Sequence, residues 1–283
     1  MIYFTEYELD RLIEDDAPMG DMTTQLIGLA GKQGSLKILA RHAMTVCCTE
    51  EAARVLQKAG VEVLSYVTSG TQINEGDKIL EARGDASSLH LVWRSSGVLI
   101  EFASGIATRT RQLVALAKTD RGPIPVAGTR KHPPFLKKIA LKALLAGGGV
   151  PHRTGISDTI LVFREHLLFV GGYANLPAVI AQVKQQQKER KVVVEAHSTD
   201  EALMASRFGA DAVQIDKMEP GLFREAVRQC KAENPEVQLL AAGGVNAANA
   251  AAYASAGADV LVTSWMYYAP PADIQVKLEP LNT

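Results

Sequence analysis

Positively charged side chains concentrate in one stretch of this sequence, from Gly128 to Asp158. The stretch contains Arg130, Lys131, Lys137, Lys138, Lys142, His152 and Arg153. The whole chain is almost neutral, with 30 Lys and Arg against 31 Asp and Glu and a formal net charge of −1 at pH 7. A local cationic concentration on a neutral protein indicates an anionic ligand and argues against general binding to nucleic acid.

His152 and Arg153 follow the glycine run of this stretch, and two interpretations are open for them. They can be a loop histidine beside a surface arginine. Alternatively, they can be fixed on a carboxylate of a ligand, because a planar guanidinium matches two oxygens at once. Before the glycine run, a proline pair can open a helix. The lysines of that helix are interpreted as its solvated face, and they are Lys137, Lys138 and Lys142.

Two acidic residues close apolar, strand-like runs: Glu195 ends VVVE and Asp216 ends AVQID. Either acid alone can be a solvated residue at a strand end. Together with basic residues on neighbouring strands, the two can hold a magnesium ion and the hydroxyls of a phosphorylated sugar, because hard cations prefer oxygen ligands. Gly243 and Gly244, in LAAGGVN, suit a turn in which backbone N–H groups approach phosphate oxygens.

The second half of the chain has the pattern of a scaffold that could bring these residues together. Strand-like runs alternate with helix-like segments, and the runs are 124–127, 159–163, 192–196, 212–215, 237–242 and 260–263. This alternation predicts a parallel βα array. We expect a barrel rather than an open sheet, partly because no GxGxxG follows the first strand. Reactive groups of such barrels follow the C-terminal ends of the strands, which adds Phe163 and Ser264 to the candidates.

The first part of the chain mixes helical and strand-like patterns. Helices are expected at 5–15, at 49–59 with Thr49 as its cap, and over 87–116, where Gly97 and Gly105 argue against one unbroken helix. Residues 17–24 are expected to form a loop, and strands are expected within 35–48, 61–67 and 77–85. The expected domains are 1–117, 118–266 and a C-terminal segment, 267–283, that packs back on the first domain.

Several features indicate a reduced, cytoplasmic setting. The N-terminus lacks a basic region followed by an apolar run, so a secretory signal is not expected. No apolar segment reaches the roughly 18 residues that span a bilayer. Cys47, Cys48 and Cys230 match neither a disulfide framework nor a metal-ligand spacing.

A set of short motifs resembles the nicotinate-nucleotide pyrophosphorylase family, also called quinolinate phosphoribosyltransferase. The motifs are GDMTT (20–24), SGIAT (104–108), TRK (129–131), GGGVPHRTGISD (147–158), the strand that ends at Glu195, ADAVQID (210–216) and AGGVN (242–246). The resemblance implies an α/β fold with an N-terminal open α/β sandwich and a C-terminal incomplete parallel α/β barrel (TIM-like). It also implies an active site shared across a homodimer, or across the dimers of a hexamer.

The resemblance further implies a magnesium-dependent reaction in which phosphoribosyl pyrophosphate donates its phosphoribosyl group to a ring nitrogen of quinolinate. The implied catalytic residues are Lys131, Glu195 and Asp216, of which Glu195 and Asp216 also hold the metal. The implied substrate-binding residues are Arg130, His152, Arg153, the residue at Phe163, and Arg94, which would reach into the neighbouring subunit's site. The implied phosphate-binding residues are Gly243, Gly244 and Ser264.

The sequence departs from the family pattern at the acceptor site. Where the family reads LIKDNH, this chain reads LVFREH, so Phe163 replaces a lysine that binds the substrate. The family's TRKT is TRKH here, with His132 in the last position, and its SGG is AGG, beginning at Ala242. Ser264 stands where the family has the glycine of the last phosphate turn. These departures favour an acidic aromatic acceptor that is quinolinate-like but not quinolinate. With these departures the sequence resembles the ModD-type branch of the family, pyrophosphorylases associated with molybdenum utilisation.

Two other functions are compatible with the same residues. One is a phosphate-binding barrel aldolase or isomerase that uses the amine of Lys131 or Lys217. The other is a non-catalytic protein that binds phosphoribosyl pyrophosphate or serves as an accessory in molybdenum handling. The departures at Phe163, Ala242 and Ser264 are what supports the second of these.

Overall fold

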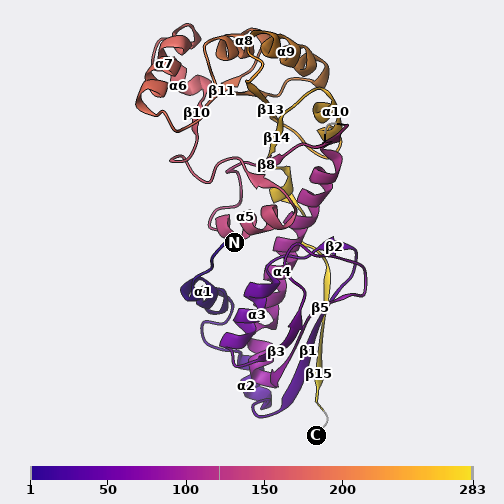
Figure 1. The fold of residues 1–283 in the computed structure, drawn as a ribbon. Helices are drawn as coiled ribbons and strands as arrows, with labels where there is room; N and C mark the ends of the chain where they lie inside the picture. Colours follow the sequence, from indigo (N-terminus) through magenta and orange to yellow (C-terminus); the bar gives the residue numbers. More distant parts are fainter. Residues whose placement is uncertain (1, 121, 282–283) are drawn as a thin grey trace. The chain divides into compact units, whose positions relative to one another are not determined.

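The structure, a computed structural model, describes residues 2–120 and 122–281. Its contacts group into two compact units, and Figure 1 labels the elements of each. The N-terminal unit comprises Met1–Arg111, His132–Gly148 and Met266–Thr283, and the barrel unit comprises Gln112–Lys131 and Gly149–Trp265. The domain ranges expected from the sequence, 1–117, 118–266 and 267–283, stay a prediction. Within the described ranges, no helix is long and apolar enough to cross a membrane.

The N-terminal unit contains an antiparallel sheet of four strands in the order β15-β1-β5-β3. The strands are β1 (Gln33–Ala40), β3 (Glu62–Tyr66), β5 (Lys78–Asp85) and β15 (Ile274–Pro280). Every second residue of β1 is buried, Leu36 and Ile38 among them, so one face of the sheet lies against the core. β15 is the last strand in the chain, yet it pairs with β1 from Ile274 to Pro280.

The N-terminal unit also contains helices, several of which pack on the core face of this sheet. They are α1 (Glu6–Asp16), α2 (Met22–Ile27), α3 (Thr49–Lys58), α4 (Ala86–Leu116), whose last turn belongs to the barrel unit, and α5 (Lys137–Ala146). Leu9, Leu56 and Val92 join the strand residues in one buried apolar cluster. A second, small pair of strands is formed by β2 (Met44–Thr45) and β4 (Gln72–Ile73). This arrangement confirms the expected N-terminal α/β sandwich.

Three local expectations for this unit were wrong. Cys48, not Thr49, caps α3, and it does so with φ of +61° and without a side-chain hydrogen bond. The expected loop at 17–24 contains the start of α2, which Asp21 caps by accepting from two backbone N–H groups. α4 is unbroken despite its glycines. At Gly105 the backbone of Pro270 approaches more closely than any side chain would allow.

The barrel unit contains a parallel sheet of seven strands in the order β10-β11-β12-β13-β14-β8-β9. The strands are β8 (Val126–Gly128), β9 (Val150–Pro151), β10 (Ile160–Val162), β11 (Val192–Ala196), β12 (Ala212–Asp216), β13 (Gln238–Ala242) and β14 (Val260–Thr263). Within the described ranges, no pairing closes the sheet between β9 and β10. This confirms the expected incomplete parallel barrel.

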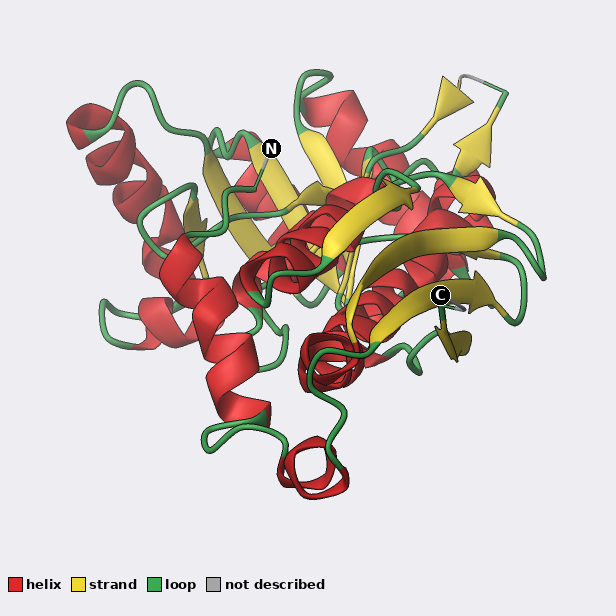
Figure 2. Ribbon diagram, turned by 90° about the horizontal axis from the view of Figure 1, so that it is seen from below, coloured by secondary structure: helices red, strands yellow, loops and turns green. Residues whose placement is uncertain are grey.

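Helices follow the strands and cover one face of this sheet, as Figures 1 and 2 show. They are α6 (Arg164–Leu168), α7 (Leu176–Gln186), α8 (Thr199–Arg207), α9 (Pro220–Glu233) and α10 (Ala250–Ser255), with the short 3-10 turn η1 (Tyr173–Asn175). A second 3-10 turn, η2 (Trp265–Tyr268), begins in this unit and belongs mostly to the N-terminal unit. β6 (Lys118–Thr119) and β7 (Gly122–Pro123) form a hairpin before β8. The strands pass through the unit as nearly continuous apolar runs because both faces are buried.

The face of the sheet that carries a small apolar cluster is here called the inner face. The cluster contains Ala127, Leu161, Val193, Ala212, Leu240, Ala242 and Val262, with Phe163 and Val260 packed against it. Side chains alternate between faces along a strand, so residues two positions further on lie on the same face. Glu195 and Gln214 therefore stand on the inner face, two positions after Val193 and Ala212 in their strands.

Lys142 is not part of a solvated helix face, as the sequence had suggested. Its side chain is only 13% exposed and forms ion pairs with Glu50, at 2.8 Å, and with Glu51. Burial opposes its charge, but the hydrogen bonds to the two carboxylates raise the pKa of Lys142 overall. Burial likewise opposes the charge of Glu50, while Lys142 and Ser69 lower the pKa of Glu50 to about 2. The pairs therefore bind α5 to α3.

Replacing Lys142 with methionine is expected to lower the free energy of unfolding by about 2 kcal/mol, because two partly buried carboxylates lose their cation. Urea unfolding measures this change. Lys138→Met is the matched control on the same helix, since its ion pair with Glu8 is more exposed than those of Lys142 and should contribute less than about 1 kcal/mol. Equal effects of the two substitutions would show that Lys142 does not anchor α5.

Candidate active site

Nearly all of the residues predicted to form the site lie at one edge of the parallel sheet. The C-terminal ends of parallel strands meet at the same edge. Arg130 and Lys131 follow β8, His152 and Arg153 follow β9, Phe163 follows β10, Glu195 lies in β11, Asp216 ends β12, Gly243 and Gly244 follow β13, and Ser264 follows β14. Arg94 is the exception: it lies in α4 of the N-terminal unit, exposed and stacked 4.8 Å from the ring of Trp93.

Glu195 and Asp216 share a histidine, His197, which the sequence analysis did not include among the candidates. His197 Nε2 lies 3.3 Å from Glu195 Oε1, and His197 Nδ1 lies 3.9 Å from Asp216 Oδ2. Lys217 Nζ lies 3.8 Å from Asp216 Oδ2, but its side chain is 78% exposed. The two carboxylates are far less exposed, at 13% and 17%. The strands thus hold two shielded acids next to one another.

The environment of Glu195 disfavours its negative charge. Burial raises the pKa of Glu195 most, and the nearby Asp216 raises it further, while His197 and a hydrogen bond from Gln214 act in the opposite direction. A cation between the two carboxylates would relieve this repulsion. The described residues contain no group of three or more His, Cys, Asp or Glu arranged to hold a metal ion. Magnesium nevertheless fits, because it is bound by one or two carboxylates with water and substrate phosphates supplying the remaining oxygens.

Gln214 is a neighbour of Glu195 that the sequence analysis missed. Its Nε2 donates to Glu195 Oε2 at 2.8 Å, and the residue is only 7% exposed. Its Oε1 is buried and has no hydrogen-bond partner among the described residues. Leaving such an acceptor unsatisfied costs about 1–3 kcal/mol. The sequence contained one indication of it: Gln214 is a polar residue within the apolar run AVQID, two positions before Asp216 and therefore on the same face of the strand.

Tyr173, also missed, fixes the backbone beside Glu195. Its hydroxyl lies 3.3 Å from each of two carbonyl oxygens, those of Glu195 and Glu201, and it can donate to them. Burial, followed by the charges of Glu201 and Glu195, raises the pKa of Tyr173. The tyrosine therefore stays a neutral donor and holds the end of β11 against α8.

Arg153 is stacked on Phe163, which the sequence had marked as the main departure from the family pattern. The guanidinium carbon lies 5.5 Å from the centre of the Phe163 ring, and Arg153 is only 9% exposed. Burial lowers the pKa of Arg153, Arg130 adds to this effect, and Asp158 opposes it. A guanidinium over an aromatic face keeps its N–H edges free for a carboxylate.

His152 is neutral at pH 7 in this environment. Burial lowers the pKa of His152 to about 4, and the charge of Arg153 contributes, although Asp158 acts in the opposite direction. Asp158 itself accepts from the backbone N–H of Thr154 at 3.0 Å and from its hydroxyl at 3.2 Å, which closes the loop that carries Arg153. The stretch after β9 therefore presents one full positive charge, at Arg153, and one neutral imidazole.

The loops after β8, β13 and β14 are tied together by hydrogen bonds. Thr129 N–H donates to Thr263 O at 3.0 Å, and Lys131 N–H donates to the Thr129 hydroxyl at 3.1 Å. The Thr263 hydroxyl donates to Val245 O at 2.6 Å. The exposed Lys131, the turn at Gly243 and Gly244, and Ser264 therefore belong to one connected group of loops.

Gly243 occupies a position where no other residue fits without movement. Its φ is +77°, and a Cβ atom would meet the Asp216 carboxylate and lie 2.6 Å from the backbone nitrogen of Lys217. Gly244 has a similar φ of +89°, but a Cβ there would meet nothing within 4 Å. The first glycine thus lets β13 approach Asp216, whereas the second only relieves backbone strain.

Gly243→Ala is therefore expected to lower the free energy of unfolding by about 2 kcal/mol, against about 1 kcal/mol for Gly244→Ala, which carries only the left-handed strain. Chemical denaturation of both variants checks the difference. Gly243→Ala should also displace the Asp216 carboxylate, which Gly244→Ala should leave in place. If the two variants are equally stable, the close approach of Gly243 to Asp216 does not contribute to the free energy of unfolding.

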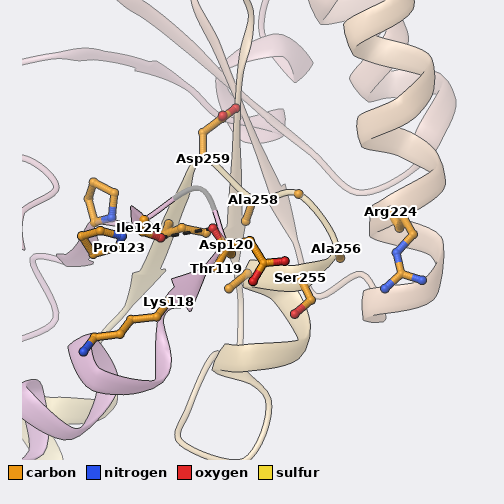
Figure 3. Close-up of a pocket in the computed structure, with 14 residues that line it drawn as sticks. Lys118, Thr119, Asp120, Pro123, Ile124, Arg224, Ser255, Ala256, Ala258 and Asp259 are labelled. Carbon is orange, nitrogen blue, oxygen red and sulfur yellow. Dashed lines mark hydrogen bonds between the residues drawn. The ribbon is translucent and has the colours of Figure 1, made fainter.

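A separate cavity of about 580 Å³ lies at the other end of the sheet. It is lined by residues that precede β8 and β14, such as Asp120 and Ser255, and by Arg224 of α9. Figure 3 shows that the side chains of Lys118 and Arg224 lie on opposite sides of it and do not converge. This cavity is not part of the candidate site.

Comparisons with known proteins agree with the architecture. The model of the quinolinate phosphoribosyl transferase N-terminal domain matches residues 21–104, and that of the C-terminal domain matches residues 106–277. A protein of Rhodobacter capsulatus named "Putative pyrophosphorylase ModD" is 41% identical over 253 residues, which is 89% of this chain and 96% of that protein. A "Probable nicotinate-nucleotide pyrophosphorylase (carboxylating)" of Methanothermobacter thermautotrophicus is 28% identical over 96% of this chain and 98% of its own length. The crystal structure of NadC from Streptococcus pyogenes has the same fold, with a TM-score of 0.89, 24% identity and full coverage of both chains.

Proposed function

Since the chain belongs to the quinolinate phosphoribosyltransferase family, we propose that it transfers the phosphoribosyl group of phosphoribosyl pyrophosphate to a ring nitrogen of an acidic aromatic acceptor other than quinolinate. The family relationship makes it a pentosyltransferase that resembles nicotinate-nucleotide pyrophosphorylase. The observation that carries the proposal is the distribution of charge along one sheet edge. Cations follow β8 and β9, and shielded carboxylates stand on β11 and β12.

This distribution suits the charges that change during phosphoribosyl transfer. Positive charge develops on the sugar as pyrophosphate leaves, so the site must stabilise both partners of the breaking bond. Lys131, at the end of β8, faces the leaving pyrophosphate in this proposal. Glu195 and Asp216 hold the ribose hydroxyls beside the developing positive charge. The same two carboxylates hold magnesium, which when bound neutralises charge on the pyrophosphate.

The acceptor is held on the other side of the site. Arg153 and Arg130 bind its carboxylate, and neutral His152 offers a hydrogen bond. Arg94 is proposed to enter the site of the neighbouring subunit in a homodimer, or in a hexamer built of dimers. Phe163 provides an aromatic surface where the family has a lysine, so a second carboxylate finds no cation there. Gly243, Gly244 and Ser264 are proposed to contact the sugar phosphate.

The experiment that tests this function combines two measurements on the wild-type chain. Calorimetry with phosphoribosyl pyrophosphate and magnesium should show binding. Pyrophosphate release should then appear with at least one member of a panel of aromatic acids. Absence of binding would contradict the proposal. Binding without turnover for every acid would instead support the non-catalytic alternative.

The aldolase alternative is less compatible with the geometry. A lysine that forms a Schiff base is normally desolvated, so that its amine is neutral. Both Lys131 and Lys217 are exposed. Borohydride trapping with a sugar phosphate distinguishes this chemistry, and we expect no trapped adduct.

A further inference from the structure

The floor of the candidate site is a row of three side chains on adjacent strands. Glu195 and Gln214 are register partners between β11 and β12. Phe163 directly follows Val162, whose partner Val194 precedes Glu195, and it packs on the inner-face cluster. Adjacent strands are about 4.8 Å apart, so Phe163 and Gln214 stand about 10 Å apart at the same depth, with Glu195 between them. A single aromatic ligand on this floor can reach all three.

The amide of Gln214 has only one possible orientation in this row. Its Nε2 donates to Glu195 Oε2 at 2.8 Å, and an ionised carboxylate only accepts. Reversing the amide would set its oxygen against the carboxylate oxygen. Oε1 is therefore fixed as an acceptor, buried and without a partner among the described residues. A group that donates a hydrogen bond is what this position lacks.

The same floor offers nothing to a second anionic group of the ligand. The aromatic ring of Phe163 occupies the position nearest Arg153, and the guanidinium stacks on it at 5.5 Å. Towards β12 the carboxylates of Glu195 and Asp216 and the carbonyl of Gln214 all accept. His197 already lies against the two carboxylates, and the cation of Lys217 is on a side chain that is 78% exposed. The site is thus cationic at one end and rich in acceptors at the other.

We propose that Gln214 is a specificity-determining residue that accepts a hydrogen bond from an amino, hydroxyl or ring N–H group of the acceptor. The acceptor is then an aromatic acid with one carboxylate, bound at Arg153, and a hydrogen-bond donor on the part of the ring that faces β12. The proposal rests on the proposed phosphoribosyl transfer and names its substrate class.

The test uses pyridine-3-carboxylate and its derivatives that carry an amino group, a hydroxyl group or a second carboxylate on the ring. Calorimetry on the full chain measures each dissociation constant without phosphoribosyl pyrophosphate, so that no turnover occurs. We expect the wild type to bind the best donor-bearing acid at least tenfold more tightly than the unsubstituted acid, and the dicarboxylic acid no more tightly. In Gln214→Met this preference should fall about tenfold, which corresponds to 1.4 kcal/mol.

The readout is a ratio within one variant, so a general loss of folded protein does not imitate it. Gln214→Leu provides a second substitution of similar size. Gln229→Met is the matched control, because Gln229 donates to Glu225 at 2.7 Å in the same way but on the exposed surface of α9. It should leave the preference unchanged.

An unchanged preference in Gln214→Met, or no preference for donor-bearing acids in the wild type, would overturn the proposal. So would a tenfold loss of phosphoribosyl pyrophosphate affinity in Gln214→Met with the acid preference intact, since the donor would then be a ribose hydroxyl. Failure of the proposed function has a different signature: wild-type protein that neither binds phosphoribosyl pyrophosphate nor releases pyrophosphate, whatever its preference among acids.

Discussion

Magnesium-dependent release of pyrophosphate is expected to fall about 1000-fold when Glu195 or Lys131 is replaced by alanine, the size of effect seen when one preorganised electrostatic group is removed. Glu195 stands with its side chain 13% exposed, 3.3 Å from His197 and within the influence of Asp216. Its charge therefore acts in a partly desolvated site, where it is more effective than in water. Lys131 follows β8 at the same sheet edge, where the pyrophosphate is proposed to leave.

Two controls separate this chemistry from misfolding. Glu195→Gln preserves the shape of the side chain without its charge and should be nearly as inactive as Glu195→Ala. Glu225→Ala removes a surface carboxylate of α9 that pairs with Arg228, and it should leave release unchanged. Unaltered release in both Glu195→Ala and Lys131→Ala would remove the basis for the assigned roles.

Quinolinate is expected to be a poor substrate of the wild type and a better one of Phe163→Lys. A hydrogen bond to a charged group contributes about 1.5–3 kcal/mol, so the new ammonium should improve quinolinate binding by about 10–100-fold. In the wild type, Arg153 stacks on the aromatic ring of Phe163, and a second carboxylate has no cation to meet. Competition calorimetry with quinolinate measures the change.

Phe169→Lys is the matched control for this substitution, because it adds the same charge at an exposed phenylalanine of the same unit. It should not alter quinolinate affinity. Wild-type turnover of quinolinate at an ordinary enzymatic rate, about 1–1000 per second, would show that Phe163 does not exclude it.

Alternation of apolar runs with helical segments was enough to predict most of the barrel unit. The expected runs at 192–196 and 260–263 coincide with β11 and β14. This pattern is reliable because strands buried on both faces must be apolar throughout. The positions of site residues followed from the same pattern, since a parallel sheet brings the ends of all its strands to one edge.

The remaining features depend on contacts between residues that are distant in sequence. Lys142 was expected in solvent because its helix is amphipathic, yet Glu50 and Glu51 enclose it. Gln214 received no role because a polar residue in a strand reveals its partner only when the register is known. His197 follows β11, and its contact with Asp216 depends on the neighbouring strand. The stack of Arg153 on Phe163 was equally hidden, although both residues had been singled out.

The most direct test of the whole account is a calorimetric titration of phosphoribosyl pyrophosphate, with magnesium, into the wild type and into the Glu195→Ala/Asp216→Ala double variant. We predict that the wild type binds one phosphoribosyl pyrophosphate per chain and that its affinity depends on magnesium. The double variant should lose binding while still unfolding cooperatively, which shows that it is folded. Binding of equal affinity in both proteins, or none in the wild type, would contradict the claim that this sheet edge is a magnesium-dependent phosphoribosyltransferase site.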